Sequence, residues 1–466
     1  MGYKMSPFGH HVCGVGLMDE QQLKALKPEL DRFLDRYAPL FGRDGNRAHA
    51  RRFVQGLLRG GDRRNTENIA EALDGGPVRS LQAFVTTGAW KDADVVAALR
   101  GQILDALGDA DAVWNSDETG FPKKGTKSVG VKRQYSGTLG RTDNCQVAVF
   151  ANYCSTKGHT FVDRRLFLPE DWADDVDRRT EAGVPKDVMF RTKPALALEM
   201  IAGAVAAGVP FRWAGGDCVY GDNPTFVQGV RALGKWYVLD ISSDTQVWTA
   251  APQVTPADQR PRPARGRQPT KPLVVGDRRR VDEIAASLPA GAWRRVVVGE
   301  GSQGPRVCEY AEVPVWFCED QLPGPGERLL VYRSLSQEPE LKYHRSNAPA
   351  EVPLEKLAQV RGVRWTIEED IQSCKGECGL DEYETRGWVG WHHHTALSML
   401  ALAFLVLRKH QLGGKRAPDD RARSAGATDA PIGRADLGHR RDPEMVPVAT
   451  GTQSPRRSQS SQAAPR

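Results

Sequence analysis

The sequence predicts an α/β protein, in which helices flank a mixed β-sheet, a helical domain precedes the sheet and a β-rich insertion interrupts it. Apolar residues recur at three- and four-residue spacing over the first hundred residues, as in amphipathic helices. From Val113 short runs of strand composition begin, and they then alternate with helical segments. From about residue 244 strand-like runs follow one another instead. The expected divisions are a helical domain (1–110), the first part of the core (111–243), the insertion (244–346), the C-terminal helices of the core (347–411) and a tail (412–466).

Composition and length are compatible with more than one domain and with a polyanionic partner. A chain of 466 residues is long for a single core. With 40% hydrophobic and 26% charged residues, its composition is that of an ordinary globular protein. A net charge of +6 suits a nucleic acid without requiring one.

Nothing in the sequence predicts a membrane or secretory protein. The N-terminus lacks a charged segment followed by an apolar one, so a secretory signal is not expected. The longest apolar run, Ala396–Leu407, is shorter than the roughly 20 residues of a membrane span and is expected to form a buried helix. The eight cysteines form no paired zinc pattern, which favours reduced thiols in a cytoplasmic protein.

The N-terminal segment is expected to be helical from about Asp19 to Leu107. Within it Arg43, Arg47 and Arg51 repeat every four residues and therefore share one helix face. Such a basic stripe can neutralise DNA phosphates. We expect Arg47 and Arg51 to contact DNA, although a solvated charged face explains the same pattern equally well.

The core is expected to combine antiparallel and parallel strands. The runs 146–153 and 160–168 have strand composition and are separated by a hairpin-like turn. Helices are expected at 194–207 and 224–233, and a further strand at 236–241. Early strands followed by alternating helices and strands predict a mixed sheet covered on both faces.

The insertion begins with a loop-like stretch and continues with strands. Residues 260–272 are rich in Pro and Arg, which indicates a loop. Strand-like runs follow at 293–298, 313–318 and 328–332. The arginines of the insertion could line a path for DNA, or could simply be solvated.

Two lone aspartates stand where an apolar strand is expected to run into a turn that contains glycine. Asp117 follows Ala112-Val-Trp-Asn-Ser and precedes Gly120, and Asp217 follows Phe211-Arg-Trp-Ala-Gly-Gly and precedes Gly221. Loops at the ends of strands are where a rigid sheet presents reactive groups. Both carboxylates are therefore candidates for a site.

A third carboxylate lies on an expected helix that starts near Arg364. At about 100° per residue, Arg364, Glu368 and Lys375 fall within roughly 40° of one another. For this helix alone, a solvated face with salt bridges is the simpler interpretation. Together with the two aspartates, however, Glu368 completes a set of three carboxylates from separate elements, which suits a pair of hard Mg²⁺ ions.

These motifs resemble those of the DDE transposases of bacterial insertion sequences. They are Asp-x-Thr-Gly-Phe-Pro-Lys at Asp117, Gly-Asp-x-x-Tyr-Gly-Asp at Asp217, and Arg-x3-Glu-x6-Lys around Glu368. The resemblance extends from about Arg51 to Lys409. In one respect the chain departs from the family pattern, because Arg361 stands where the family has a tyrosine.

The resemblance implies an RNase H-like catalytic core that cleaves DNA at transposon ends and transfers the strand into target DNA. It implies two Mg²⁺ ions, for which Mn²⁺ can substitute, with Asp117 bridging both ions and Asp217 and Glu368 each binding one. Arg364 and Lys375 would hold phosphates. The expected partners are double-stranded DNA and, because two ends must be joined together, a second copy of the chain. The expected location is the cytoplasm, at the nucleoid when DNA is bound.

Neighbouring acids compete for these roles. Glu118 should point away from Asp117, because side chains alternate along a strand. Glu369 lies about 100° round the helix from Glu368 and so leaves the face of Arg364. Asp222 is the corresponding competitor for Asp217.

Other features and functions stay open at this point. The triple histidine His392–His394 could bind a metal, although helix capping or DNA contact is the preferred interpretation. The tail 412–466 has the composition of a disordered segment. A DNA-binding regulator with this fold, or an RNase H-like nuclease that cuts without joining, are the alternative functions.

Overall fold

The computed structural model describes residues 20–59, 63–73, 77–137, 140–261, 267–301 and 304–413. All of them belong to one unit, residues 1–415. The tail predicted to be disordered lies outside the described residues from residue 414 onward. Arg262 and Arg265 of the insertion also lie outside them.

The N-terminal segment is helical, as predicted. Its apolar stripes meet in a core that includes Phe53, Leu57 and Leu81, each fully buried. Its elements are α1 (Glu20–Asp35), η1 (Ala38–Phe41), α2 (Asp44–Leu58), α3 (Thr66–Ala72), α4 (Val78–Thr86) and α5 (Asp92–Leu107).

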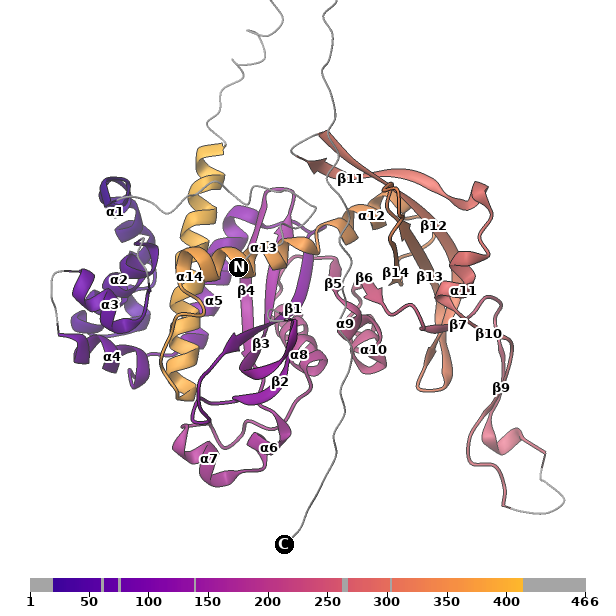
Figure 1. Cartoon of the computed structure of the whole chain (residues 1–466), viewed down its shortest axis with the longest axis horizontal. Coiled ribbons are helices and arrows are strands. Elements are labelled where there is room, and N and C mark those ends of the chain that lie inside the picture. Colours follow the sequence, from indigo (N-terminus) through magenta and orange to yellow (C-terminus); the bar gives the residue numbers. More distant parts are fainter. Residues whose placement is uncertain are drawn as a thin grey trace, which may run out of the picture. The chain divides into compact units, whose positions relative to one another are not determined.

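Five strands form the centre of the structure, in the order β4-β3-β1-β5-β6 (Figure 1). β1 pairs antiparallel with β3 and parallel with β5, and β5 pairs parallel with β6. The prediction of a mixed sheet is therefore confirmed. The strands are β1 (Val113–Pro122), β3 (Arg141–Ser155), β4 (Gly158–Leu166), β5 (Trp213–Gly216) and β6 (Trp236–Ile241), and β2 (Lys132–Ser136) pairs with the first part of β3.

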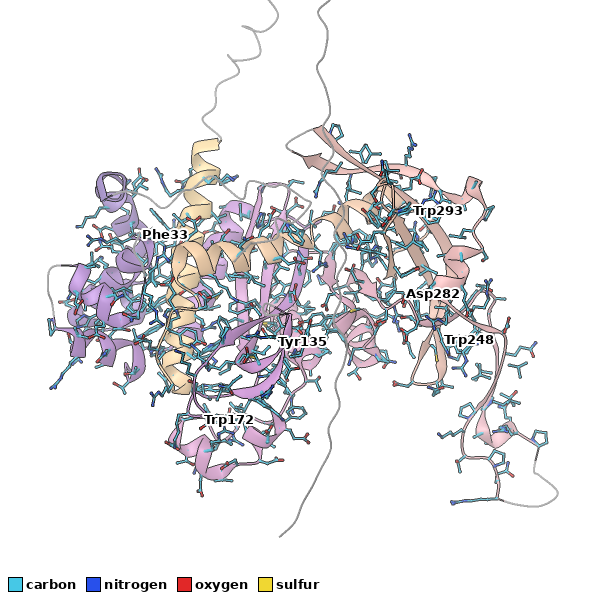
Figure 2. The ribbon with its side chains drawn as sticks, viewed as in Figure 1. Phe33, Tyr135, Trp172, Trp248, Asp282 and Trp293 are labelled. Atoms are coloured by element: carbon cyan, nitrogen blue, oxygen red, sulfur yellow. The ribbon has the colours of Figure 1, made fainter. Side chains whose placement is uncertain are left out.

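The insertion is rich in strands, as predicted, but it extends the central sheet. Its strand β14 pairs antiparallel with β6, so β13, β12, β7 and β10 continue the same sheet beyond the core. Figure 2 labels Trp248 and Trp293 in this part, where Arg333 stacks over the ring of Trp293 at 3.9 Å. The strands are β7 (Gln246–Trp248), β8 (Gln253–Thr255), β9 (Leu273–Val275), β10 (Arg278–Arg280), β11 (Arg294–Gly301), β12 (Gly304–Glu319), β13 (Leu322–Arg333) and β14 (Leu341–Ser346); β8 and β9 form a separate pair.

Helices cover both faces of the central sheet. Two neighbouring residues of β1, whose side chains point to opposite faces, contact different helices. Asp117 contacts Arg364 at the start of α13, whereas Glu118 contacts Lys193 of α8. Figure 1 shows α13 running across β1, β3 and β4. The remaining helices are α6 (Glu170–Ala173), α7 (Val176–Glu181), α8 (Lys193–Ala206), α9 (Cys218–Gly221), α10 (Pro224–Ala232), η3 (Ala257–Gln259), α11 (Val281–Ala286), η4 (Ala290–Ala292), α12 (Leu354–Gly362) and α13 (Trp365–Cys378).

The last helix, α14 (Trp388–Gly413), contains the apolar run Ala396–Leu407, which the sequence predicted to form a buried helix. It packs against α2, α4, α5 and β4, and the ring centroid of Phe404 lies 5.5 Å from that of Phe33. Figure 2 labels Phe33 beside α14. The N-terminal helices and the sheet therefore share one hydrophobic core. Among the described residues, no helix is both long and apolar enough to cross a membrane. The expected domain boundaries stay predictions.

Candidate functional site

Strand register brings Asp117 and Asp217 together. In the parallel pair β1–β5, Asn115 lies opposite Gly215, and each aspartate follows two residues later. Asp217 stands directly after β5, as expected, and caps α9 by accepting a hydrogen bond from the Val219 amide at 3.0 Å. The expectation that β1 ends at Asp117 is wrong. The strand runs on to Pro122, with Asp117 opposite Phe150, because Gly120 stays in the ladder with β3.

Two glycines allow this close arrangement. A Cβ atom on Gly215 would lie 2.1 Å from Oδ1 of Asn115, on the neighbouring strand. A Cβ atom on Gly221, at the end of α9, would lie 2.0 Å from the backbone oxygen of Asp240. The turn that carries Asp217 can therefore lie close to both neighbouring strands only because these two positions have no side chain.

Arg364 links Glu368 to Asp117. The short break between α12 and α13 places Arg364 as the N-cap residue of α13. Its Nη2 donates to Oε1 of Glu368 at 2.5 Å, and its Nη1 lies 3.4 Å from Oδ2 of Asp117. The Arg364 and Asp117 side chains are 13% and 15% exposed, so water screens this contact weakly. The predicted shared face of Arg364 and Glu368 is present.

A fourth carboxylate, Asp240, also lies in this cluster, and sequence reasoning gave it no role. Gly216 lies opposite Leu239 in the parallel pair β5–β6, so Asp240 is level with Asp217. Its Oδ2 lies 3.5 Å from both Arg364 and Arg361. Asp240 is the only charged residue in the strand Trp-Tyr-Val-Leu-Asp-Ile. A lone carboxylate in an apolar strand is the feature of the sequence that could have indicated its place in the cluster.

The electrostatics of the cluster are unusual. Burial, followed by the charge of Asp217, raises the pKa of Asp117 to about 8. Burial, followed by the charge of Glu118, raises the pKa of Asp217 to about 6. Burial would also raise the pKa of Asp240, but His344 and the two arginines outweigh it and hold that pKa well below its usual range. The positive charge around Asp117 and Asp217 is therefore too small to offset burial and the neighbouring negative charges.

A polar network fixes α13 on the sheet. Asn152 of β3 donates through Nδ2 to Oγ1 of Thr366 at 2.9 Å and to Oδ2 of Asp370 at 2.8 Å. Nδ1 of His159, on β4, lies 2.9 Å from Oδ1 of the same aspartate. At the other end of the helix, Gly379 adopts a left-handed conformation (φ 60°) and ends it. The position of Glu368 therefore follows from the docking of α13.

The competing acids have hydrogen-bond or ion-pair partners of their own, although the charge of Glu118 still acts on Asp217. Glu369 lies 3.5 Å from His159, on the side of α13 away from Arg364. Glu118 accepts from Lys193 at 2.8 Å and from the buried Tyr220 hydroxyl at 3.2 Å. Asp222 accepts hydrogen bonds from Ser242 and Thr245, in the turn after β6. The expected directions of Glu118 and Glu369 agree with these contacts.

The other predicted contact residues lie outside the acidic cluster. Nζ of Lys375 donates to the Gly120 carbonyl at 3.0 Å, within the same helix–sheet interface. In α2, Arg47 donates to Asp44 at 3.0 Å and Arg51 pairs with Asp35. The two arginines are 40% and 37% exposed and so remain accessible. Their role at DNA stays a prediction.

The triple histidine packs α14 against its neighbours, and His394 contacts the C-cap residue of α13, while a DNA contact stays a prediction. The rings are part of the packing of α14: the ring nitrogens of His393 lie 2.9 Å from the carbonyls of Val85 and Trp90, and a neutral ring donates to one of the two, while His394 donates to the carbonyl of Gly379. Burial lowers the pKa of His392 and of His394 to about 4. All three rings therefore stay neutral and hold helices together.

The chain matches known proteins in sequence. Residues 36–305, more than half of the chain, match the family model of DDE superfamily endonucleases, and this range includes Asp117 and Asp217 but not Glu368. A probable transposase for insertion sequence element IS701 of Microchaete diplosiphon is 32% identical over 190 residues. That alignment covers 40% of this chain and 46% of the relative, which is less than half of the relative's length.

Two solved structures are distantly similar. A piggyBac transposase in a synaptic complex with hairpin DNA has a TM-score of 0.37 and 11% identity, and the likeness covers 84% of this chain and 73% of that one. The NurA nuclease of Sulfolobus solfataricus has a TM-score of 0.24 and 8% identity, over 58% of this chain and 81% of that one. Similarity this low carries no argument, whereas the family match does: the chain belongs to the DDE superfamily of endonucleases.

Proposed function

We propose that this chain is a transposase that cleaves DNA at the ends of a mobile element and joins them to target DNA. The observation that carries the proposal is the meeting of Asp117, Asp217 and Glu368, which come from a strand, a strand end and a helix. Binding DNA alone does not need three converging carboxylates. The similarity to a probable insertion-sequence transposase supports the same activity.

We further propose that residues 111–243 and 347–411 form an RNase H-like core. Its support is the strand order β4-β3-β1-β5-β6, with three antiparallel strands followed by two parallel neighbours. In this arrangement the first acid lies on the central strand and the second at the end of the adjacent parallel strand. The insertion would then be an extension of the edge formed by β6.

The donor set fits the divalent metal ions that DDE endonucleases generally use. Carboxylate oxygens are the ligands that Mg²⁺ and Mn²⁺ prefer, and the raised pKa values of Asp117 and Asp217 mark a cluster short of positive charge. Among the described residues no group of three acidic, histidine or cysteine side chains is arranged around one metal position. The guanidinium of Arg364 lies between two of the proposed ligands, since it contacts both Asp117 and Glu368.

The proposed roles rest on the resemblance to DDE transposases, and the contacts of Arg364 with Asp117 and Glu368 support them. Asp117 would bind two Mg²⁺ ions, Asp217 one of them and Glu368 the other, with Mn²⁺ able to replace Mg²⁺. Such a pair of ions supplies an activated nucleophile and charge stabilisation at phosphorus. Arg364 would exchange its bonds to Asp117 and Glu368 for bonds to a phosphate, which its planar donors suit. Lys375 would hold a phosphate farther along the helix.

We propose double-stranded DNA as the partner, with two copies of the chain acting on two ends. The net charge of +6 and the exposed arginines of α2 support DNA binding. The second copy is inferred from the reaction, because both ends have to be joined together. A cytoplasmic location, at the nucleoid, is the corresponding place of action.

The test is an assay with purified protein, Mg²⁺ and labelled DNA that carries the flanking ends of its own element. The native chain is compared with Asp217→Ala and with Asp222→Asn, a nearby carboxylate bonded to Ser242. Cleaved and joined products are expected from the native chain and from Asp222→Asn, and neither product from Asp217→Ala.

The alternative functions give different products. Binding without cleavage by the native chain would contradict the proposal and favour a DNA-binding regulator. Cleavage without a joined product would contradict the transposase proposal and favour a nuclease that cuts without joining. The chelator EDTA is expected to stop both reactions but not DNA binding.

A further inference from the structure

Asp240 is partly buried in the sheet, with its side chain 20% exposed, and both of its carboxylate oxygens contact neighbouring side chains. Its Oδ1 accepts from Nδ1 of His344 at 2.8 Å, and its Oδ2 lies 3.5 Å from Arg361 and from Nε of Arg364. The carboxylate thus has a histidine on one oxygen and two guanidinium groups on the other. These contacts leave it little capacity to bind a metal ion as well.

The three contacts of Arg364 divide into two kinds. Nη1 and Nη2 contact Asp117 and Glu368, which are proposed metal ligands. Nε lies 3.5 Å from Oδ2 of Asp240, which is not among them; this contact is an ion pair, and among the described residues Nε makes no hydrogen bond. A cation that binds Asp117 and Glu368 competes with the Nη groups of Arg364 but leaves the Nε contact in place. The guanidinium can therefore turn toward a substrate while one edge stays fixed.

We propose that Asp240 is a positioning residue that anchors Arg364 through Nε, so that its Nη groups can leave Asp117 and Glu368 for a DNA phosphate without leaving the site. This inference rests on the proposed function, because it assumes that divalent ions bind those two carboxylates. Outer contacts of this kind commonly tune metal affinity about 10- to 100-fold.

The anchor is itself held by the insertion. His344 lies on β14, opposite Asp240 in the antiparallel pair β14–β6, and its side chain is fully buried. Because a carboxylate only accepts, Nδ1 of His344 carries the proton of this bond. Arg361, at the end of α12, supports the other oxygen. Thus β14 connects the insertion to the acidic cluster through one side chain, and the anchor is built before any ligand arrives.

The experiment is a double-mutant cycle on Mn²⁺ affinity, measured by calorimetry on the full chain without DNA. The four proteins are the native chain, Asp240→Asn, Arg364→Ala and the double variant. Without its anchor, Arg364 is expected to pair fully with Asp117 and Glu368 and to compete with the ion. Asp240→Asn should therefore weaken Mn²⁺ binding about tenfold in the native chain, but less than twofold when residue 364 is alanine.

Equal weakening in both backgrounds would overturn the inference, since the effect would then come from lost charge or lost packing alone. So would an unchanged Mn²⁺ affinity of Asp240→Asn. Circular dichroism and thermal unfolding establish that each variant is folded. Should the asparagine variant fail to fold, Asp240→Glu carries the same cycle, because it keeps the charge and displaces the anchor by one methylene group.

The failure of the proposed function would look different. In that case Mn²⁺ would not bind the native chain, or its binding would be unaffected by Asp217→Asn. If Mn²⁺ binding depends on Asp217 but the effects of Asp240 and Arg364 are not coupled, the result contradicts the proposed anchor and leaves the proposed metal site in place.

Discussion

At the scale of single residues, the candidate site is a group of four carboxylates around one arginine, Arg364. Asp117, Asp217 and Asp240 lie level on three adjacent strands, and Glu368 approaches from a helix. Arg364 contacts three of these four carboxylates, and its charge also acts to lower the pKa of the fourth, Asp217. Since one guanidinium cannot balance them all, the cluster is poised to accept further cations.

Adjacent glutamates on α13 should differ sharply in importance. Glu368→Gln is expected to lower the cleavage rate at least about a hundredfold, because its carboxylate contacts the cluster. Glu369→Gln is expected to change it less than about threefold, since Glu369 lies against His159. Initial rates on a pre-cut DNA end measure both. Similar losses in the two variants would contradict the assignment of Glu368.

The pKa of Asp117 predicts how stability depends on pH in the absence of metal. That pKa, about 8 in the folded chain, lies above the value of 3.8 for a free side chain. The folded state therefore holds a proton that the unfolded state has lost, and stability falls as the pH rises from about 4 to 8. The melting temperature of the native chain should fall by about 2 °C per pH unit relative to Asp117→Asn.

Thermal unfolding in EDTA across that range measures this difference. Asp222→Asn is the control and should follow the pH dependence of the native chain, because its carboxylate is bonded to Ser242 and Thr245 instead. A constant difference between the native chain and Asp117→Asn would contradict the buried cluster.

Much of the site was predictable from the sequence, and the missing part has a physical reason. The family motifs identify Asp117, Asp217 and Glu368, and helical geometry separates Glu368 from Glu369. Asp240 belongs to no motif of this kind. Its place depends on the register of β6 against β5 and on the approach of β14, which are long-range pairings that local sequence does not determine.

At the scale of elements, the turn from β5 to α9 depends on close backbone contact. It carries Asp217 past Asn115 on one side and Asp240 on the other, with glycines at both contacts. On the other side of the cluster, α13 is fixed by Asn152 and His159. Precision at the site therefore comes from how these two elements dock.

Gly215→Ala should loosen the site without touching a catalytic group. The new methyl would lie 2.1 Å from Oδ1 of Asn115, so this buried side chain must shift and disturb its bond to Asn152, at a cost of about 1–3 kcal/mol. Gly203→Ala is the control: Gly203 lies on α8 with open space around it, and alanine should stabilise the helix by up to about 1 kcal/mol. Urea unfolding compares the two variants, and equal stabilities would contradict tight packing at Gly215.

The elements themselves were largely predictable, but their connections were not. Strand composition predicted β3, β4 and β6, and apolar spacing predicted α8 and α10. The insertion was expected to be rich in strands, but the pairing of its strand β14 with β6 was not predicted. Composition determines which segments form strands, but edge pairing depends on partners distant in sequence.

At the scale of the whole molecule, the basic face of α2 is the best candidate for a DNA contact outside the site. Arg47 and Arg51 each have a carboxylate partner, but exposed salt bridges of this kind are worth only about 0–1 kcal/mol. A DNA phosphate can therefore replace Asp44 or Asp35 at little cost.

The double variant Arg47→Ala/Arg51→Ala should lower the salt dependence of DNA binding. If both side chains contact phosphates, the slope of log K against log [salt] falls in magnitude by about two. Fluorescence anisotropy over a series of salt concentrations measures the slope. Arg295→Ala, at a 74% exposed side chain of the insertion, is the comparison for a single surface charge. An unchanged slope in the double variant would show that Arg47 and Arg51 do not contact DNA phosphates and form only surface salt bridges.

The central claim is that these carboxylates hold the metal ions that cleave DNA, and a change of ligand chemistry tests it most directly. Asp217→Cys replaces a hard oxygen ligand by a soft thiolate, which suits Mn²⁺ better than Mg²⁺. The account predicts cleavage by this variant in Mn²⁺ but not in Mg²⁺, while the native chain uses both and Asp217→Ala uses neither. Equal activity of Asp217→Cys in the two metals, or inactivity in both alongside an active Asp217→Ala, would contradict the account.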